Sequence, residues 1–375
     1  MPNSAERREP LRVLITTDAV GGVWQYSLDL AASLARRGAH VLLASLGPRP
    51  SPEQRQTALR TPRLTLAESD FALEWTAEPW AGVDAGGEWL LSLQAEFQAD
   101  VIHLNCYAQA ALAWGKPVIV VAHSCVYSWW QAVHGFAAGA EWIEYRRRVT
   151  AGLAAADCIV APSSYMASEL QRIYGAPSEK IQVIHNFSSA RSTAENLRQP
   201  FILAAGRIWD RAKNVALLNC LAPKLDWEIR VAGSNSGPGT SAQNFNLVSL
   251  GALPHGELMG QMAKAAVFAH PALYEPFGLS VLEAARSRCC LVLSDIESMR
   301  ELWGDAAILI DPRDADRWVF ELNALAREPT KVEEFGRRAR ERSRRYGYAR
   351  AINRYSKLYE SLIRSARKTG REAAA

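Results

Sequence analysis

Short apolar runs rich in β-branched residues recur along the first half of the chain, separated by stretches with the spacing of amphipathic helices. Strands are predicted at residues 11–17, 40–46, 100–104, 117–122, 158–161 and 181–185. Helices are predicted at residues 24–37, near 108–114 and at 164–174. Because strands joined by helical crossovers pair in parallel, residues 1–190 are expected to form one doubly wound domain.

The same alternation restarts after a polar stretch at residues 188–199, which we interpret as an inter-domain linker. Strands are predicted at residues 200–205, 227–232, 246–250, 265–269, 290–293 and 307–310, and late helices at 318–327, 331–346 and 348–366. We therefore predict an α/β protein with two Rossmann-like, doubly wound domains that face each other across a cleft. The second domain is expected at residues 191–345, followed by a last helix and tail at residues 346–375.

Two glutamates stand eight positions apart around one of these strand-to-helix loops. Glu275 follows the strand at 265–269, and Glu283 lies about two turns into a helix predicted at residues 277–286. The N–H groups at the start of such a helix can bind an anion, and carboxylates accept hydrogen bonds from hydroxyl groups. A nucleotide-sugar carries both kinds of group. Either glutamate alone could instead be a turn residue or a solvated helix residue.

A glutamate, seven residues and a second glutamate, with Phe277-Gly278 after the first, resembles the signature of retaining glycosyltransferases of the family 4 type, which have the GT-B fold. The resemblance extends over about residues 11–360. It implies transfer of a sugar from a nucleoside diphosphate to a glycan or lipid-linked acceptor, with retention at the anomeric carbon. We expect neither a cofactor nor, since we identify no Asp-x-Asp sequence, a metal. It also implies an acceptor-binding first lobe, a donor-binding second lobe, and a last helix that returns to the first lobe.

The resemblance also assigns roles to individual residues. Glu275 would hold sugar hydroxyls, Glu283 the ribose, and the loop around Leu253 the base. The remaining donor-binding residues would be Gly21, Gly22, Phe277, Gly278 and Leu279. The glycine pair could be a simple turn, but it also permits close backbone approach and positive φ. His123 follows the strand at 117–122 and would place a carbonyl or ring near the reacting carbon, unless it is a core or surface histidine.

Basic residues follow the first strand of the second domain. Arg207 and Lys213 resemble the Gly-Arg…Lys phosphate motif of the same family, as a bidentate donor and a point cation suited to a diphosphate. The spacing is one residue longer than usual, so Arg211 or Lys213 could be the second cation, and we favour Lys213. A pair of surface cations is the alternative.

Seven tryptophans fall within residues 71–145, and Trp129-Trp130 stand soon after His123. Indole faces can stack on sugars, so these two are the best acceptor-binding candidates. Core packing is the more frequent use of tryptophan.

The positive charge is concentrated at the end of the chain. The net charge of the whole sequence is +4, whereas residues 331–375 hold 14 basic and 5 acidic residues. These residues could form a solvated helix face, or they could contact an anionic membrane surface or acidic glycan. The candidates for that contact are Arg337, Arg338, Arg340, Arg344 and Arg345. No nucleic-acid recognition motif accompanies the charge, so nucleic acid is not an expected partner.

The remaining composition is that of an ordinary globular protein. The six cysteines form no Cys-x-x-Cys pair, the first ten residues lack an apolar signal segment, and no apolar run is long enough to span a bilayer. We expect a cytoplasmic protein that could lie peripherally at the inner face of the membrane.

Three other functions compete with sugar transfer. A sugar-nucleotide epimerase would bind the same donor, and a phosphorylase of the glycogen type would need a pyridoxal lysine, for which no motif appears. A catalytically inactive nucleotide-sugar-binding scaffold would tolerate loss of the cleft residues, yet Glu275, Glu283, Arg207 and Lys213 are all present.

Overall fold

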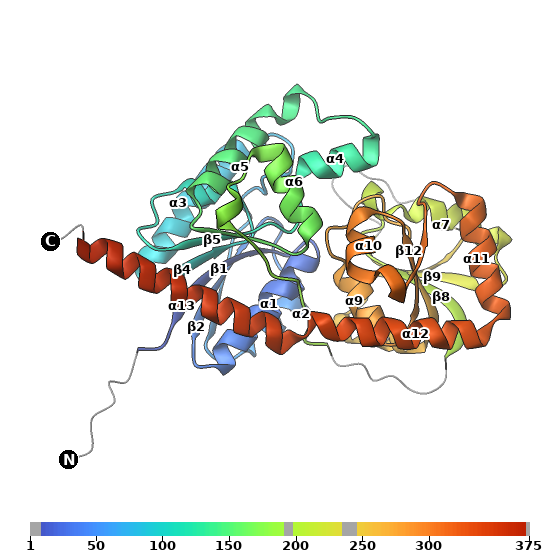
Figure 1. Ribbon diagram of the computed structural model, residues 1–375. Coiled ribbons are helices and arrows are strands. Elements are labelled where there is room, and N and C mark those ends of the chain that lie inside the picture. The colour runs from blue at the N-terminus through green and yellow to red at the C-terminus, as the bar shows by residue number, and fades with distance from the viewer. Residues whose placement is uncertain (1–8, 191–197, 235–245, 373–375) are drawn as a thin grey trace, which may run out of the picture.

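The computed structural model describes residues 9–190, 198–234 and 246–372, which fold into two α/β lobes (Figure 1). The first lobe is built on a parallel sheet with the strand order β3-β2-β1-β4-β5-β6-β7. Its strands are β1 (Arg12–Asp18), β2 (His40–Leu46), β3 (Leu64–Glu68), β4 (Val101–Leu104), β5 (Val118–Val121), β6 (Cys158–Ala161) and β7 (Ile181–Val183).

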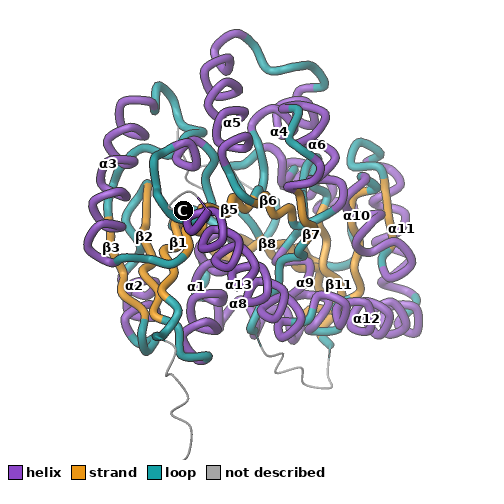
Figure 2. The backbone as a smooth tube through the Cα atoms, turned by 60° about the vertical axis from the view of Figure 1, so that its left-hand side comes forward, coloured by secondary structure: helices purple, strands orange, loops and turns teal. Residues whose placement is uncertain are grey.

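Helices cover both faces of this sheet (Figure 2), and an apolar core lies on each face. They are α1 (Gly22–Arg36), α2 (Pro52–Leu59), α3 (Trp80–Phe97), α4 (Val126–His134), α5 (Ile143–Ala155) and α6 (Ser164–Tyr174), with the 3-10 turns η1 (Ala108–Ala111), η2 (Ala140–Trp142) and η3 (Ser178–Lys180). The helix predicted near 108–114 is wrong, because η1 is a single 3-10 turn. The chain becomes extended at Leu112, and the Trp114 indole donates to the Gln109 carbonyl at 2.9 Å, which holds this turn closed.

The second lobe has a parallel sheet with the order β10-β9-β8-β11-β12-β13. Its strands are β8 (Gln199–Ala205), β9 (Glu228–Ala232), β10 (Val248–Gly251), β11 (Ala265–His270), β12 (Cys290–Ser294) and β13 (Ile308–Ile310). Its helices are α7 (Val215–Leu221), α8 (His255–Lys264), α9 (Leu279–Arg286), α10 (Glu297–Trp303), α11 (Ala315–Arg327) and α12 (Pro329–Ser343), with the 3-10 turns η4 (Arg211–Lys213), η5 (Ala222–Lys224), η6 (Gly304–Ala306) and η7 (Arg344–Tyr346). The predicted fold class, two doubly wound α/β domains, is confirmed.

The last helix, α13 (Tyr348–Glu372), crosses from the second lobe and lies along the first (Figure 1). The Tyr26 hydroxyl donates to the Tyr355 hydroxyl at 2.6 Å, and Tyr359 bonds His103 Nδ1 at 2.8 Å. The predicted domain boundary after residue 190 adjoins residues 191–197, which lie outside the described part, so the boundaries stay a prediction. Within the described ranges, no helix combines the length and apolarity needed to cross a membrane.

The strand order reverses once in each sheet, between β1 and β4 and between β8 and β11. At such a switch point the loops leaving the two strands diverge and open a crevice at their carboxyl ends. The loop after β1 contains Gly21-Gly22, the loop after β8 contains Arg207, and the loop after β11 contains Glu275. Contacts between the first of these loops and the second lobe bring the two crevices together.

Candidate active site

Two helix N-termini meet where the lobes face each other. Helix α1 begins at Gly22 and α9 begins at Leu279, and no side chain caps either N-terminus. A Cβ atom added to Gly22 would lie 3.3 Å from Leu279 Cδ1, so the two helix starts are in contact. Free N–H groups and the positive ends of two helix dipoles therefore point into one gap, which favours an anion there.

The glycine pair is required for close approach rather than for unusual backbone angles. The φ angle of Gly21 is −168°, an extended value, and Gly22 has no positive φ either, so neither glycine uses the left-handed region. A Cβ on Gly21 would lie 3.1 Å from Arg207 Nη1 of the other lobe. A larger residue would push this guanidinium out of the gap.

Helix α9 begins two residues later than predicted. Gly278 is its N-cap residue, with a left-handed φ of +82°, so Phe277 lies before the helix and is buried in the core of the second lobe. Glu283 consequently lies about one turn into the helix rather than two.

Arg207 leaves the end of β8 and forms an ion pair with Asp210, Nη2 to Oδ2, at 2.7 Å. The other Asp210 oxygen accepts a hydrogen bond from the Trp129 indole of the first lobe at 3.1 Å. Burial alone would raise the pKa of the Asp210 carboxyl, but the charges of Arg207 and Lys213 outweigh it and lower that pKa. Asp210 therefore stays ionised and holds Arg207 at the boundary between the lobes.

A close contact between two glycines shapes this loop. Gly206 N donates to the Ala232 carbonyl at 3.0 Å, and a Cβ on Gly233 would lie only 1.7 Å from the Gly206 carbonyl oxygen. Only glycine fits at position 233, which the sequence reasoning did not single out. This contact sets the path by which Arg207 reaches the gap.

Lys213 lies against Glu275. Its ammonium donates to Glu275 Oε2 at 2.6 Å, and His270 Nε2 lies 3.0 Å from the same oxygen. Burial alone would raise the pKa of this carboxyl, but the charge of Lys213 and the hydrogen bond from His270 hold it well below its usual range. Arg211, the alternative second cation, is exposed. His270 is therefore a direct partner of Glu275, and its place at the end of β11 is the sequence signal that could have identified it.

Glu283 is buried and already has two partners. Its Oε1 accepts from the Ser188 hydroxyl at 2.8 Å and lies 2.8 Å from His255 Nε2. The next residue, Ser189, donates its N–H and its hydroxyl to Asp29 of α1, at 2.7 and 2.6 Å. The segment that ends the first lobe is therefore hydrogen-bonded to both lobes, through Ser188 to the second and through Ser189 to the first. Neither serine carried a sequence signal, since both stand in a polar stretch.

The pairing of His255 with Glu283 gives the protein a pH-dependent contact. The hydrogen bond to Glu283 raises the pKa of His255 above its ordinary 6.5. A group whose pKa is higher in the folded state than in the unfolded state stabilises the fold at pH values below its unfolded-state pKa. This stabilisation is lost as the pH rises through the folded-state pKa. We expect His255→Gln to lower the free energy of unfolding at pH 6 and to have no effect by pH 9. Chemical unfolding at both pH values, with His134→Gln as control, measures this free energy. An equal loss of stability at pH 6 and pH 9 would contradict the pH dependence.

The segment that would hold the base ends just before His255. Leu253 is half-buried and packs against the core of the second lobe, two residues before α8 begins. Part of the Leu253 side chain therefore contributes to core packing.

His123 stands at the end of β5 with a defined proton position. Its Nε2 lies 2.8 Å from Asn105 Oδ1, while Asn105 Nδ2 donates to the Thr16 carbonyl at 2.6 Å. Since the amide nitrogen is the donor, Oδ1 is an acceptor and His123 Nε2 carries a hydrogen. Burial lowers the pKa of His123 well below its ordinary value, so the ring is neutral at pH 7.

The two candidate tryptophans have different surroundings. Trp129 donates to Asp210 across the lobe boundary, whereas the ring of Trp130 packs 4.4 Å from His134 within an aromatic cluster. The structure thus brings Trp129, but not Trp130, into contact with the residues around Arg207.

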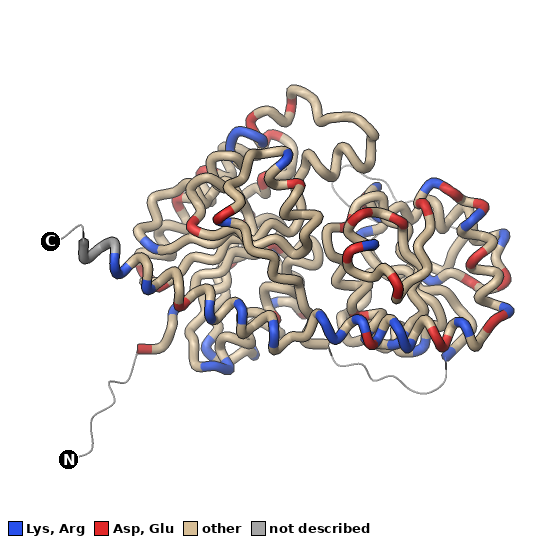
Figure 3. Tube along the Cα trace, viewed as in Figure 1, with Lys and Arg blue, Asp and Glu red and all other residues tan. Residues whose placement is uncertain are grey.

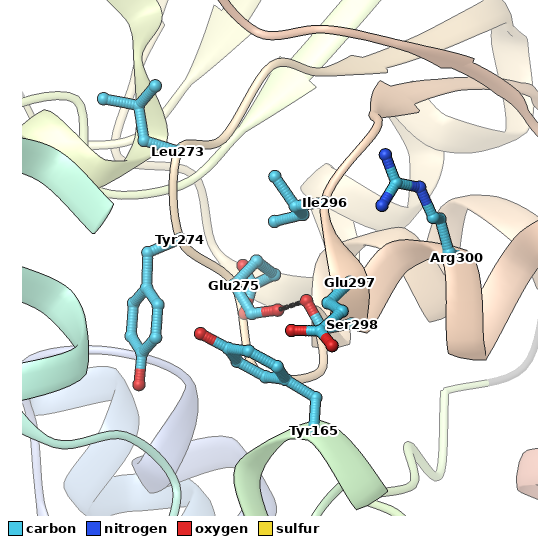
Figure 4. A pocket seen from close by; sticks show the side chains of 8 residues that line it. All are labelled: Tyr165, Leu273, Tyr274, Glu275, Ile296, Glu297, Ser298 and Arg300. Atoms are coloured by element: carbon cyan, nitrogen blue, oxygen red, sulfur yellow. Dashed lines mark hydrogen bonds between the residues drawn. The ribbon is translucent and has the colours of Figure 1, made fainter. Parts of the chain in front are cut away.

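Tyr274, which directly precedes Glu275, inserts into the first lobe. Its hydroxyl bonds Ser128 Oγ at 2.7 Å and accepts from Cys125 N at 3.3 Å, and its ring belongs to a small apolar cluster with Val133 and Ala212. A cavity of about 350 Å³ opens beside Glu275. Tyr165 reaches into it from α6 of the first lobe, opposite Glu297 and Ser298 (Figure 4).

A carboxylate of the second lobe caps a helix of the first. Glu301 of α10 accepts from the backbone N–H groups of Ser164 and Tyr165, at 2.8 and 2.9 Å. These are the first residues of α6, where free N–H groups and the helix dipole favour an anion. Glu301 therefore joins the second lobe to the first.

Removing that contact should open the molecule. Helix-terminus contacts of this kind are worth about 1 kcal/mol, so Glu301→Ala should shift the closed–open equilibrium about fivefold toward open. Small-angle X-ray scattering should show a larger radius of gyration than for wild type. Glu297→Ala, on the same helix, is the control, and equal radii for all three proteins would rule out this role for Glu301.

The expectation that no metal is needed overlooked one Asp-x-Asp sequence, Asp314-Ala-Asp316. Asp314 is the N-cap of α11, and its carboxylate accepts from Arg317 N at 3.0 Å. That oxygen therefore serves as the N-terminal cap of the helix. Metal independence stays a prediction.

Two sequence-family models match consecutive parts of the chain. Glycosyltransferase Family 4 matches residues 20–188, and Glycosyl transferases group 1 matches residues 187–342. The α-maltose-1-phosphate synthase of Mycolicibacterium smegmatis is 26% identical over 62% of this chain and 70% of that protein. The D-inositol 3-phosphate glycosyltransferase of Xylanimonas cellulosilytica is 25% identical over 89% of this chain and 90% of that protein. Among solved structures, sucrose-phosphate synthase from Thermosynechococcus elongatus has a TM-score of 0.75 at 18% identity, over 95% of this chain and 100% of that one.

Proposed function

This chain belongs to the glycosyltransferases of family 4 and group 1, and on that basis we propose that it transfers a sugar from a nucleoside diphosphate to an acceptor hydroxyl with retention at the anomeric carbon. The observation that carries the proposal is the meeting of two uncapped helix N-termini beside Arg207 and Lys213. Negative charge builds on the diphosphate as it leaves the sugar. Fixed N–H donors and cations aimed at that charge stabilise the transition state more than the ground state.

The glutamates supply hydroxyl acceptors on either side of the diphosphate. Lys213 and His270 engage Glu275 Oε2, which leaves Oε1 for a sugar hydroxyl in the adjoining cavity. Ser188 and His255 engage Glu283 Oε1, which leaves Oε2 for the ribose. Because Lys213 touches Glu275, one ion pair links the group that binds the sugar to the group that neutralises the leaving phosphate.

The reaction needs no protein nucleophile. The bond from the anomeric carbon to the phosphate oxygen breaks, and its electrons stay on the diphosphate. The acceptor oxygen bonds to the same carbon on the same face, and its proton passes to the departing phosphate oxygen. Neutral His123 adds no positive charge beside the oxocarbenium-like carbon. Closure of the lobes through Tyr274 and Glu301 would exclude water.

The base and donor can be found by ligand-induced stabilisation. UDP, GDP and ADP are compared by thermal shift, since a bound ligand raises the apparent stability of the fold. The matching nucleotide-sugar is then incubated with acceptors, and release of nucleoside diphosphate is measured. The names of several similar proteins contain a phosphorylated sugar or polyol, so such compounds join glycans and lipid-linked sugars in the screen.

The same assay separates the competing functions. An inactive scaffold releases no nucleoside diphosphate, and an epimerase changes the sugar without releasing it. A transferase releases nucleoside diphosphate in step with product formation. The proton coupling constant at the anomeric carbon of the product, measured by NMR, tests retention; an inverted linkage would contradict the proposed stereochemistry.

A further inference from the structure

A surface hollow of about 510 Å³ lies where the chain crosses from the second lobe to the first. We call it the arginine pocket. It is lined by Arg337, Arg338 and Arg342 of α12, Arg344 and Arg345 of η7, and Arg350 of α13, together with Asp305, Ala306 and Glu341. Six guanidinium groups and two carboxylates face one hollow, and Figure 3 shows basic residues recurring along α12 toward α13.

Half of these arginines already have an acidic partner. Arg338 pairs with Glu334 of its own helix, Arg342 with Asp305 at 3.1 Å, and Arg344 with Glu341 at 2.7 Å. Arg342 also donates to the carbonyl oxygens of Glu301 and Leu302 at the end of α10. These three arginines therefore serve the structure of the second lobe.

The other three have no such partner. Arg337, Arg345 and Arg350 form no ion pair and no side-chain hydrogen bond with any residue that the structure describes. They come from three different elements yet line the same hollow. Guanidinium groups gathered in this way repel one another unless an anion lies between them.

We propose that the arginine pocket is a binding site for a phosphate group, separate from the interlobe cleft. Guanidinium groups match the oxygens of phosphate with paired hydrogen bonds, and groups from different directions can surround a tetrahedral anion. Arg337 belongs to the second lobe and Arg350 to the helix that lies along the first. A phosphate bound by both would bridge the lobes at the point where the chain crosses between them.

The test measures phosphate binding with the cleft disabled. Arg207→Ala and Lys213→Ala are introduced into every protein, so that phosphate binding in the cleft does not contribute. Inorganic phosphate is titrated by calorimetry at constant ionic strength into this background and into the same background carrying Arg337→Ala, Arg345→Ala and Arg350→Ala. The triple change should weaken binding at least about tenfold, because charge-assisted contacts are lost. Arg340→Ala, exposed on the same helix but outside the pocket, should leave it unchanged.

A second arm identifies the source of the phosphate. Co-sedimentation uses vesicles made of equal parts phosphatidylcholine and phosphatidylglycerol, with phosphatidylcholine vesicles as control. Vesicle binding that is lost in the triple variant would identify a lipid headgroup, and titratable free phosphate without vesicle binding would identify a soluble ligand. The proposal is overturned if the triple change alters neither phosphate binding nor vesicle binding, or if Arg340→Ala weakens them as much as the triple change does. The arginine pocket is then only a solvated basic surface.

Discussion

Replacing Lys213 by alanine should lower turnover about a hundredfold or more while leaving the fold intact, because removing one preorganised donor from a developing anion has this effect. The ammonium lies 2.6 Å from Glu275, so its loss also frees that carboxylate from its cation. Steady-state release of nucleoside diphosphate at saturating donor measures the change, and circular dichroism with thermal unfolding checks the fold.

Arg211→Ala is the matched control for Lys213. Both residues belong to the η4 turn, and Arg211 is exposed. The control should retain wild-type turnover, and Lys213→Arg should recover part of the lost rate, since it restores the positive charge. If Arg211→Ala were the slow variant and Lys213→Ala the normal one, the second cation would have been assigned to the wrong residue.

Glu275→Gln and Glu275→Ala should each lower turnover about a hundredfold or more as well. The glutamine variant keeps the shape of the side chain but loses the charge that holds Lys213 and His270. Because the pKa of Glu275 lies well below its usual range, the carboxylate is ionised throughout the physiological pH range. The wild-type rate should therefore show no loss from protonation of Glu275 down to at least pH 5.

Glu297→Gln provides the control for Glu275, because it removes a carboxylate from the same cavity without touching Lys213. It should retain most of the activity. Equal losses in the two glutamine variants would mean that the cavity needs negative charge in general, and that the ion pair of Glu275 with Lys213 has no special role.

Much of the site could be predicted because its residues follow strands. Arg207, His123 and Glu275 each stand just after an apolar run, and in doubly wound sheets the carboxyl ends of such runs meet at the crevice. The strand order within each sheet was not predicted in detail, but the alternation of strands and helices was enough for the fold class. Gly278 shows the limit of this reasoning, since its left-handed conformation shortens α9 and moves Glu283 about half a turn closer to the helix start.

The contacts between the lobes could not be predicted from the sequence. Trp129 with Asp210, Tyr274 with Ser128, and Glu301 with the start of α6 join residues far apart in the chain. Each depends on how two separately folded sheets pack, and no local periodicity records that packing. The stretch around Ser188 looked like a plain linker, yet its serine hydroxyl binds Glu283 because the connection passes beside α9.

The central claim is that the gap between the lobes recognises a diphosphate through Arg207, Lys213 and two helix starts. The most direct test compares, by calorimetry, the affinity for the preferred nucleoside diphosphate with the affinity for the nucleoside alone. Wild-type protein should bind the diphosphate at least about a hundredfold more tightly, and this ratio should fall close to one when Arg207 and Lys213 are both alanine. A ratio near one in the wild type, or a ratio unchanged by the two substitutions, would contradict the account.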